Sequence, residues 1–431
     1  MAKLPGALRA LENREFRLYA SGQMVSLVGT WMQMIAQSWL IYRLTGSAAA
    51  LGIATFFGQL PVLLLAPLGG ILVDRLESRR LLVFTQASAL LLALALGTLT
   101  LLHWVTLWEV VAAAFLLGLV NAVDNPGRQV MVARAVPREH LMNAIALNSS
   151  MFNGARILGP ALAGILVGLL GEGWCFMLNA ASYVAVIVAL LRMRPLPGNE
   201  ARGEASALGE LREGIAFVLK DFPIRRALLL LGFLSLLVTP SSVLMPLFAD
   251  RILHGGPRAL GLLSGASGIG ALAGAVALAM RRDVRGLPGW IALAGTVFGI
   301  ALLAFARSRN LALSAVLLVP VSFGFMVVMA STNTLIQMMV PETFRGRVMS
   351  IYTVMFLGTV PLGGLLVGAV SHMFSPPATV AWTGALGLVG VAAFALGLQG
   401  FRKACRERIL AQRAAADQGL SANPEHFRAK T

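Results

Sequence analysis

Charged side chains are scarce in this chain. Only 13% of its 431 residues are charged and 57% are hydrophobic, which gives a mean hydropathy of +0.78. Soluble globular domains carry about 25% charged residues. A shortage of this size excludes a water-soluble globule and a disordered chain. We therefore expect an integral membrane protein.

Residues for metal or acid–base chemistry are also few. The two cysteines, Cys175 and Cys405, are too far apart to suggest a disulfide framework or a metal site. The five histidines fall in predicted loops, tails or span ends, and no G-x-x-x-x-G-K-[ST] sequence occurs. We expect no metal, no cofactor and no direct use of ATP. A membrane-embedded enzyme is the alternative from another class, and it lacks an intramembrane His/Asp/Glu cluster.

Long apolar runs recur from end to end. About 20 apolar residues in a helix cross the hydrocarbon core of a bilayer, and these runs do not alternate as barrel strands would. We predict twelve transmembrane helices, hence an all-α fold. They cover residues 17–42, 48–73, 81–102, 107–124, 144–169, 174–191, 227–249, 259–280, 289–306, 310–334, 347–371 and 379–400.

Basic residues lie mostly on one side of these spans. Of the 35 Lys and Arg residues, 29 fall in the two termini and the loops on the same side, and five fall in the loops opposite. Basic loops stay in the cytoplasm, so both termini are predicted to be cytoplasmic. The same asymmetry explains the net charge of +16 without a nucleic-acid partner.

The longest internal loop divides the predicted spans six and six. We expect a cytoplasmic N-terminus (1–16), two six-helix bundles (17–191 and 227–400), a central loop with an amphipathic or plain linker helix (192–226) and a basic tail (401–431). A faint repeat supports two related halves, because Gly164 to Gly168 matches Gly364 to Gly368. Duplicated halves are typical of transporters that bind substrate between them.

The loop after the second span resembles motif A of the major facilitator superfamily. Gly70, Asp74, Arg75 and Arg79 match that motif and Arg80 follows them, while Glu77 and Ser78 depart from it. The resemblance implies the major facilitator fold and a cytoplasmic gate in which Asp74 meets the start of the eleventh span, near Thr343 to Gly346. Gly70 is expected to let two helices approach closely.

The fifth span resembles a loose form of motif C of the proton-driven antiporters in that superfamily. It contains Gly154, Gly159, Pro160 and a single Gly164 where the family has closely placed glycines. The segments Asp124 to Arg128, Asn143 to Asn148 and Trp39 to Ser47 are similar to the branch containing the bacterial enterobactin exporter and related drug and macrolide exporters. The resemblance favours export, with glycines for close packing and Pro160 for a helix bend.

Polar residues inside the spans are the candidates for a substrate cavity, because polar groups in lipid are costly unless they line a cavity or pair. The first span carries them at steps of three and four, on one face. Hydrogen bonding between helices is the alternative for each. The predicted cavity residues are Thr30, Gln33, Gln37, Ser149, Asn153, Arg156, Asn179, Thr239, Asn333 and Tyr352.

Two charged residues have specific hypotheses. Arg156 lies well inside the fifth span, where we expect it to face the cavity and favour an anionic or carbonyl-rich substrate, or to pair with a carboxylate such as Asp124. No acidic residue is expected at mid-depth, since Glu109, Asp124, Glu172 and Asp250 fall near predicted span ends. Glu109 is the candidate proton site, with a solvated interface residue as the alternative.

These observations predict a secondary transporter rather than an enzyme. We expect a monomer in the inner (cytoplasmic) membrane that exports a bulky, siderophore-like or drug-like small molecule by alternating access, with the proton gradient as energy source. A lipid or lysophospholipid flippase on the same fold is the alternative.

Overall fold

The computed structural model describes residues 6–194, 207–281 and 286–417, except for a few side chains within helices. All regular structure in these ranges is helical. The first half contains a short 3₁₀ helix η1 (Gly6–Glu12), a second one, η2 (Arg138–His140), and the long helices α1 (Arg14–Thr45), α2 (Ala48–Arg75), α3 (Ser78–Leu101), α4 (Leu107–Arg134), α5 (Leu141–Leu170) and α6 (Glu172–Arg192).

The second half follows helix α7 (Ala207–Lys220), which lies in the central stretch. A π-helix, η3, precedes α10. The elements are α8 (Phe222–Val243), α9 (Met245–Leu247), η3 (Phe248–Ile252), α10 (Gly256–Ala279), α11 (Leu287–Arg307), α12 (Leu311–Met339), α13 (Glu342–Leu357), α14 (Thr359–Met373), α15 (Pro376–Leu396) and α16 (Leu398–Asp417).

Eleven helical segments in the described residues are long and apolar enough to cross a membrane. They coincide with the second to twelfth predicted runs. The first predicted run lies on α1, which is 32 residues long but does not reach the same apolarity. The polar side chains along one face of α1, such as Gln23, Gln33 and Gln37, lower its mean hydropathy.

The fourth span extends further than the sequence indicated. The sequence Asp-Asn-Pro-Gly-Arg at 124–128 was interpreted as a loop, yet α4 continues through Pro126 to Arg134. Pro126 lacks an N–H, so the carbonyl of Ala122 loses its usual helical partner. Gly69 of α2 packs against this carbonyl so closely that a side chain there would overlap it. The correction places Asp124 inside a membrane helix.

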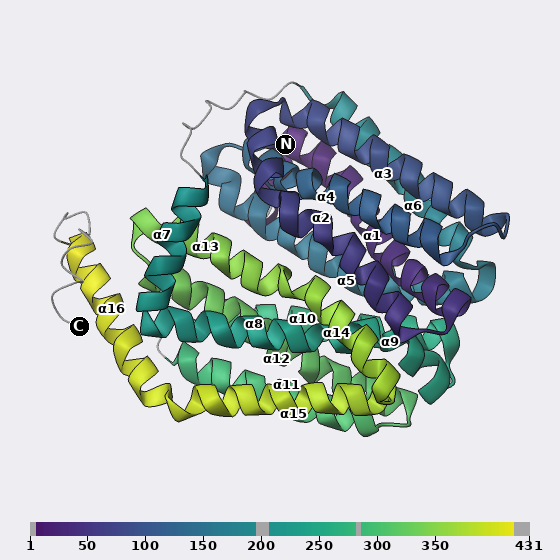
Figure 1. Ribbon diagram of the computed structural model, residues 1–431. Coiled ribbons are helices and arrows are strands. Elements are labelled where there is room, and N and C mark those ends of the chain that lie inside the picture. Colours follow the sequence, from purple (N-terminus) through teal and green to yellow (C-terminus); the bar gives the residue numbers. More distant parts are fainter. Residues whose placement is uncertain (1–5, 195–206, 282–285, 418–431) are drawn as a thin grey trace.

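Helices α1 to α6 pack mainly on one another, and so do α8 to α15. The two bundles touch chiefly where α5 meets α10 and where α2 meets α14. Figure 1 shows the bundles close together at the end where α9 lies, and diverging toward the end where the N-terminus, α7 and α13 lie. The contacts between bundles are thus concentrated at one end of the molecule.

Helices α7 and α16 lie at the diverging end (Figure 1). Phe217 of α7 stacks on Phe344 of α13 at 4.7 Å, and Arg347 of α13 forms an ion pair with Glu213 at 2.6 Å. Buried Asp221, between α7 and α8, pairs with Arg408 of α16. These contacts fasten both helices to the second bundle.

Candidate functional site

The contact between α5 and α10 is made backbone to backbone. A Cβ added to Gly164 would lie 2.9 Å from the Cα of Gly261, and one added to Gly261 would lie 2.6 Å from the carbonyl oxygen of Pro160. About two turns further along α10, a Cβ added to Gly268 would lie 2.9 Å from the carbonyl oxygen of Arg156. Gly159 instead packs on α1, against Val28 and Trp31. The motif C-like glycines therefore join α5 both to α1 and to the other bundle.

The contact between α2 and α14 repeats this arrangement. Gly52 packs against the carbonyl of Gly364. A Cβ added to Gly368 would lie 3.0 Å from the Cα of Ala49. The sequence repeat pairs Gly164 with Gly364, and the structure puts each of them on the helix that crosses to the opposite bundle. The weak repeat thus marks two equivalent contacts. We call the end of the molecule that holds both of them the sealed end.

Polar contacts close the same end. The Tyr42 hydroxyl of α1 donates to Oδ2 of Asp250 in η3 at 2.6 Å. The neighbouring Arg251 donates to the carbonyl of Gly46 at 3.0 Å, and its guanidinium lies 5.8 Å from the Tyr42 ring. Single-turn π-helices occur often at functional sites. Here the π-helix places a carboxylate and a cation together against the other bundle.

Arg156 lies where the bundles begin to diverge. Its guanidinium carbon is 5.7 Å from the centre of the Trp31 ring, which makes an edge-to-face contact with Phe152 at 5.6 Å. Ser149 is exposed about two turns nearer the diverging end than Arg156, and Asn153 donates to the Ser149 carbonyl at 2.9 Å. Together these side chains form a face of α1 and α5 that is aromatic, cationic and polar.

The described contacts of Arg156 include no carboxylate. The predicted alternative partner, Asp124, is bound to Arg128 instead. A half-buried guanidinium over an indole ring is held by cation–π attraction. No hydrogen bond joins its N–H donors to another described residue.

The polar face of α1 lies inside the first bundle. The Nδ2 of Asn179 donates to Oε1 of Gln33 at 2.7 Å, and Ser182 donates to Oδ1 of Asn179 at 2.9 Å. Gln33 is 6% exposed and Asn179 is fully buried, so the structure favours the alternative of helix–helix hydrogen bonding for this pair. Thr30 and Gln37 are half-buried on the same helix.

The predicted cavity residues of the second bundle lie on α8, α12 and α13. Asn333 accepts a hydrogen bond from Gln337 at 2.5 Å, both on α12. Buried Tyr352 of α13 donates to the Met329 carbonyl at 3.1 Å, which joins α13 to α12. The side chain of Thr239 lies outside those that the structure describes.

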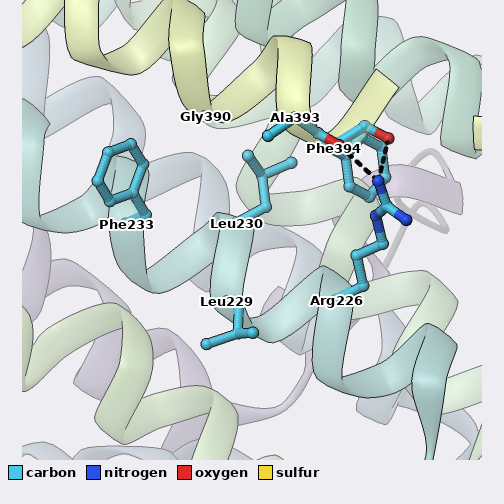
Figure 2. Close-up of a pocket in the computed structure, with 7 residues that line it drawn as sticks. All are labelled: Arg226, Leu229, Leu230, Phe233, Gly390, Ala393 and Phe394. Atoms are coloured by element: carbon cyan, nitrogen blue, oxygen red, sulfur yellow. Dashed lines mark hydrogen bonds between the residues drawn. The ribbon is translucent and has the colours of Figure 1, made fainter. Parts of the chain in front are cut away.

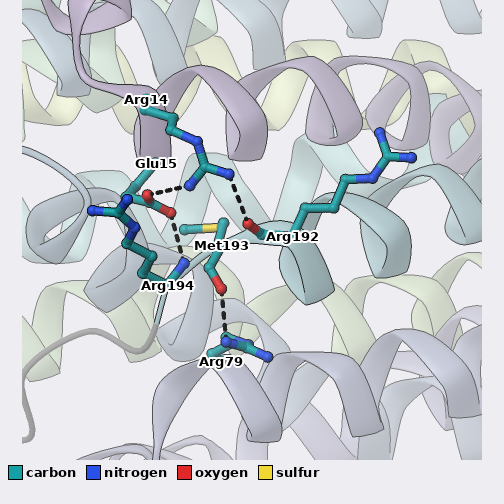
Figure 3. A network of polar contacts seen from close by, with 6 residues as sticks. All are labelled: Arg14, Glu15, Arg79, Arg192, Met193 and Arg194. Atoms are coloured by element: carbon teal, nitrogen blue, oxygen red, sulfur yellow. Dashed lines mark hydrogen bonds and ion pairs between the residues drawn. The ribbon is translucent and has the colours of Figure 1, made fainter.

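In this structure, the described side chains that match motif A make their contacts within the first bundle. Arg79 donates to the Met193 carbonyl at the end of α6 at 2.7 Å, while Glu15 and Arg14 bind the backbone of the neighbouring residues 194 and 192 (Figure 3). Arg80 pairs with Glu77 at 2.6 Å. The side chains of Asp74 and Arg75 lie outside the described ones.

The expected close approach at Gly70 is wrong. A Cβ there would meet nothing within 4 Å, whereas the preceding Gly69 packs on the Ala122 carbonyl. The reason is the helix register, because adjacent helical residues point about 100° apart and only Gly69 faces α4.

Glu109 lies at the exposed start of α4. Its carboxylate accepts hydrogen bonds from the backbone N–H and the hydroxyl of Thr106, which is a capping box. Trp104 and Trp108 beside it are 70% and 66% exposed. The contacts match a helix cap at an interface more closely than a proton site, and the proton-site hypothesis stays a prediction.

A buried polar cluster went unrecognised in the sequence. Oδ1 of Asp124 accepts hydrogen bonds from Thr85 and Gln86 of α3, each at 2.7 Å, and Oδ2 pairs with Arg128. Asp124 is 1% exposed. The signal that could have found it is the i, i+4 spacing of Asp124 and Arg128, which places the two charges on one helical face.

An apolar groove lies elsewhere, between α8 and α15. It measures about 390 Å³ and is lined by Leu229, Phe233 and Gly390, with Arg226 at one end (Figure 2). Arg226 donates to the carbonyls of Ala393 and Phe394 at the end of α15. This groove is formed within the second bundle and is separate from Arg156.

Comparison with known proteins identifies relatives along most of the chain. The family described as transmembrane secretion effector matches residues 6–410. The staphyloferrin A transporter of Staphylococcus aureus is 23% identical and covers 83% of this chain and 90% of its own. The multidrug efflux pump Tap of Mycolicibacterium fortuitum is 28% identical, covering 80% and 86%. The enterobactin exporter EntS of Escherichia coli is 26% identical, covering 87% and 90%.

Solved transporter structures share the fold. An inward-facing, occupied bacterial homologue of the lysosomal transporter Spinster superposes with a TM-score of 0.68 at 13% identity, covering 93% of this chain and 98% of its own. An inward-facing bacterial homologue of ferroportin gives 0.66 at 16% identity, covering 90% and 98%. At these identities the likeness concerns the fold alone.

Proposed function

The chain belongs to the transmembrane secretion effector family of the major facilitator superfamily, and from this premise we propose that it exports a bulky, partly apolar small molecule by alternating access. It is a transporter and not an enzyme. The observation that carries the proposal is the asymmetry of the contacts between bundles. The glycines at 164 and 261 and the bond from Tyr42 to Asp250 join the bundles at one end, while the bundles diverge at the other.

The proposed topology counts α1 as a membrane span beside the eleven more apolar ones. With the basic residues of the termini, α7 and α16 on the cytoplasmic side, the sealed end faces outward and this conformation is inward-facing. The two bundles then correspond to residues 17–191 and 227–400, and the protein works as a monomer in the inner membrane. A polar stripe on α1 is compatible with a span because neighbouring helices bury it.

The proposed substrate carries an anionic or carbonyl-rich group. Arg156, Trp31 and Phe152 offer a guanidinium with unused donors beside two aromatic rings. Such a site suits a molecule that is both aromatic or apolar and negatively charged. Relatives named for siderophore and drug transport make both classes suitable test substrates. Energy would come from the proton gradient.

The test is accumulation in cells with and without the protein. Catecholate siderophores, antibiotics, fluorescent dyes and a labelled lysophospholipid are compared at equal expression. We expect lower accumulation of at least one anionic small molecule when the protein is present. Transport of the lysophospholipid alone would instead identify a flippase, and unchanged accumulation of every compound would contradict export.

Arg156→Gln is expected to abolish export of anionic substrates while the protein reaches the membrane at normal levels. Arg156→Lys keeps the charge but loses the planar fork, so it should retain part of the activity. Arg309→Gln is the matched control, because Arg309 is exposed in the loop between α11 and α12. Full export by a normally expressed Arg156→Gln protein would remove Arg156 from the site.

A further inference from the structure

A row of buried polar atoms on α1 lacks hydrogen-bond partners among the described residues. The atoms are Tyr19 Oη, Gln23 Oε1, Ser26 Oγ and Thr30 Oγ1, spaced four, three and four residues apart. Tyr19, Gln23 and Ser26 are at most 2% exposed. Helical spacing places the four on one face of α1, over about 16 Å at a rise of 1.5 Å per residue.

The row begins beside the pair of Asp124 and Arg128. Tyr19 is close enough to interact electrostatically with both charges. Gln86, which donates to Asp124, has a buried Oε1 that likewise lacks a partner. The row and the ion pair are therefore one continuous polar region buried inside the first bundle.

Leaving such atoms without partners would be costly. Nearly all buried polar groups in folded proteins bond to protein or to internal water, because an unsatisfied one loses its hydration without replacement. Five of them in one region need a small partner that can both donate and accept. Water meets this requirement, and a file of waters with two to four polar neighbours each also conducts protons.

We propose that the polar face of α1 holds a file of internal water molecules that delivers protons to Asp124, and that Asp124 is the proton-binding residue of the transporter. A proton from the file forms an O–H bond at Oδ2 of Asp124, and Arg128 is released from that oxygen. The pair changes from neutral to a charge of +1, and the proton leaves again when Arg128 returns. This inference rests on the proposed proton-coupled export.

The groups that surround the pair favour such a switch. Thr85 and Gln86 of α3 hold Oδ1, so only Oδ2 changes partner. Tyr19 of α1 and Tyr183 of α6 lie within electrostatic reach of Arg128. Helix α2 packs here through Gly69 and Val73, with the side chains of Asp74 and Arg75 outside the described ones. Helix α5 packs against the adjoining part of α4 through apolar side chains, and Arg134 of α4 is bound to Ser78.

The side chain of Arg128 is less enclosed than that of Asp124. Its side chain is 19% exposed, whereas that of Asp124 is 2% exposed. Release of the guanidinium toward its exposed side would couple the protonation of Asp124 to a change at the surface of α4.

The experiment uses the full chain in proteoliposomes with a substrate found in the accumulation assay. Each variant is measured twice: for downhill substrate movement without a pH gradient, and for concentrative transport driven by one. Asp124→Asn keeps the size of the side chain and should lose the gradient-driven component while keeping downhill movement. Because it leaves Arg128 without a charged partner, the double variant Asp124→Asn/Arg128→Gln is measured in parallel, with the same expected result.

The water file is tested on α1 itself. The double variant Ser26→Ala/Thr30→Val replaces the unpartnered hydroxyls by apolar groups of similar size and should slow gradient-driven transport selectively. Ser21→Ala is the matched control, since the exposed Ser21 hydroxyl already donates to the Leu18 carbonyl at 2.9 Å. It should behave as the unmodified protein.

A readout without transport separates the two proposals. Infrared difference spectra of the purified protein between acid and neutral pH contain a band from each carboxyl that titrates, so the Asp124 contribution is isolated by subtracting the spectrum of Asp124→Asn from that of the unmodified protein. We expect this subtraction to leave a protonated carboxyl band. Identical spectra from the two proteins in the protonated carboxyl region, or intact gradient-driven transport by both Asp124 variants, would overturn the role of Asp124. Absence of downhill transport by the unmodified protein, with the infrared band present, would contradict the proposed export and leave the proton site standing.

Discussion

At the sealed end of the molecule the two bundles meet through glycines and through two hydrogen bonds, from Tyr42 to Asp250 and from Arg251 to the Gly46 carbonyl. At the end of α7 and α13, the polar contacts that the structure describes join elements of the same half of the chain. Arg79 binds the end of α6, and Arg347 binds α7. Glycine contacts demand a precise backbone approach, while side-chain contacts can exchange partners. The comparison teaches that one end is closed by backbone packing reinforced by two hydrogen bonds between the bundles, whereas the polar contacts described at the other end stay within one half of the chain.

The largest effect is expected from filling the glycine contact. Gly164→Val should weaken closure of the sealed end, because the added carbons would meet the Cα of Gly261 and the carbonyl of Pro257. Overpacking costs about 1–3 kcal/mol, and each 1.4 kcal/mol changes a population about tenfold. Substrate export and thiol accessibility at the sealed end measure the shift.

Gly154→Ala is the control for that variant. A Cβ at Gly154 would meet only the terminal methyl of Met24, at 4.0 Å. Export by this variant should be normal. Equal loss in both variants would show that the helix, and not the contact between bundles, is sensitive.

A smaller effect is expected from the polar contact at the same end. Asp250→Ala removes the acceptor of the Tyr42 hydroxyl, and Tyr42→Phe removes the donor. A net loss of about 1 kcal/mol shifts the population about fivefold toward opening of the sealed end. Distances between spin labels across that end would report it. If the double variant shifts the population as far as the two single shifts combined, the hydrogen bond does not act as a latch.

Asp74→Asn should act in the opposite direction. By its resemblance to motif A, Asp74 stabilises closure of the diverging end by meeting the N-terminus of α13, which contributes roughly 0.3–1 kcal/mol. Its loss should increase the conformation described here by a few-fold and slow export. An unchanged population across the diverging end would contradict this role.

The smallest effect concerns the tether between α16 and α8. Burial raises the pKa of Asp221, and Arg408 partly offsets this. A raised pKa means that the folded state binds the proton more tightly, so this carboxyl adds stability as pH falls and loses it as pH rises. Because Asn resembles the protonated carboxyl, the melting temperatures of the protein and of Asp221→Asn should be closest at low pH and separate as pH rises, with the unmodified protein the less stable by a few degrees at most.

The sequence predicted the helical runs well because apolar length is a strong signal. It failed where local chemistry was ambiguous. The sequence around Pro126 has the composition of a turn, and only the packing of Gly69 on the Ala122 carbonyl explains why the helix continues. Asp124 was assigned to a span end for the same reason, which concealed the buried ion pair.

The candidate site was predictable only in part. Arg156 could be singled out because a cation deep in an apolar run is rare. Trp31 and Phe152 were missed, since aromatic residues in apolar runs carry no signal of their own until α1 and α5 are placed together. For Gln33 and Asn179 periodicity identified a polar face, but it could not decide whether that face meets a cavity or another helix.

The most direct test of alternating access measures both ends at once. The two native cysteines, Cys175 and Cys405, are replaced, and label pairs are introduced at positions 45 and 254 across the sealed end and at positions 70 and 346 across the diverging end. Distance distributions are recorded with and without substrate, at acid and neutral pH. The account predicts opposite changes at the two ends. In the population where the distance across the sealed end lengthens, the distance across the diverging end shortens. Distances that change together, or only at one end, would contradict it.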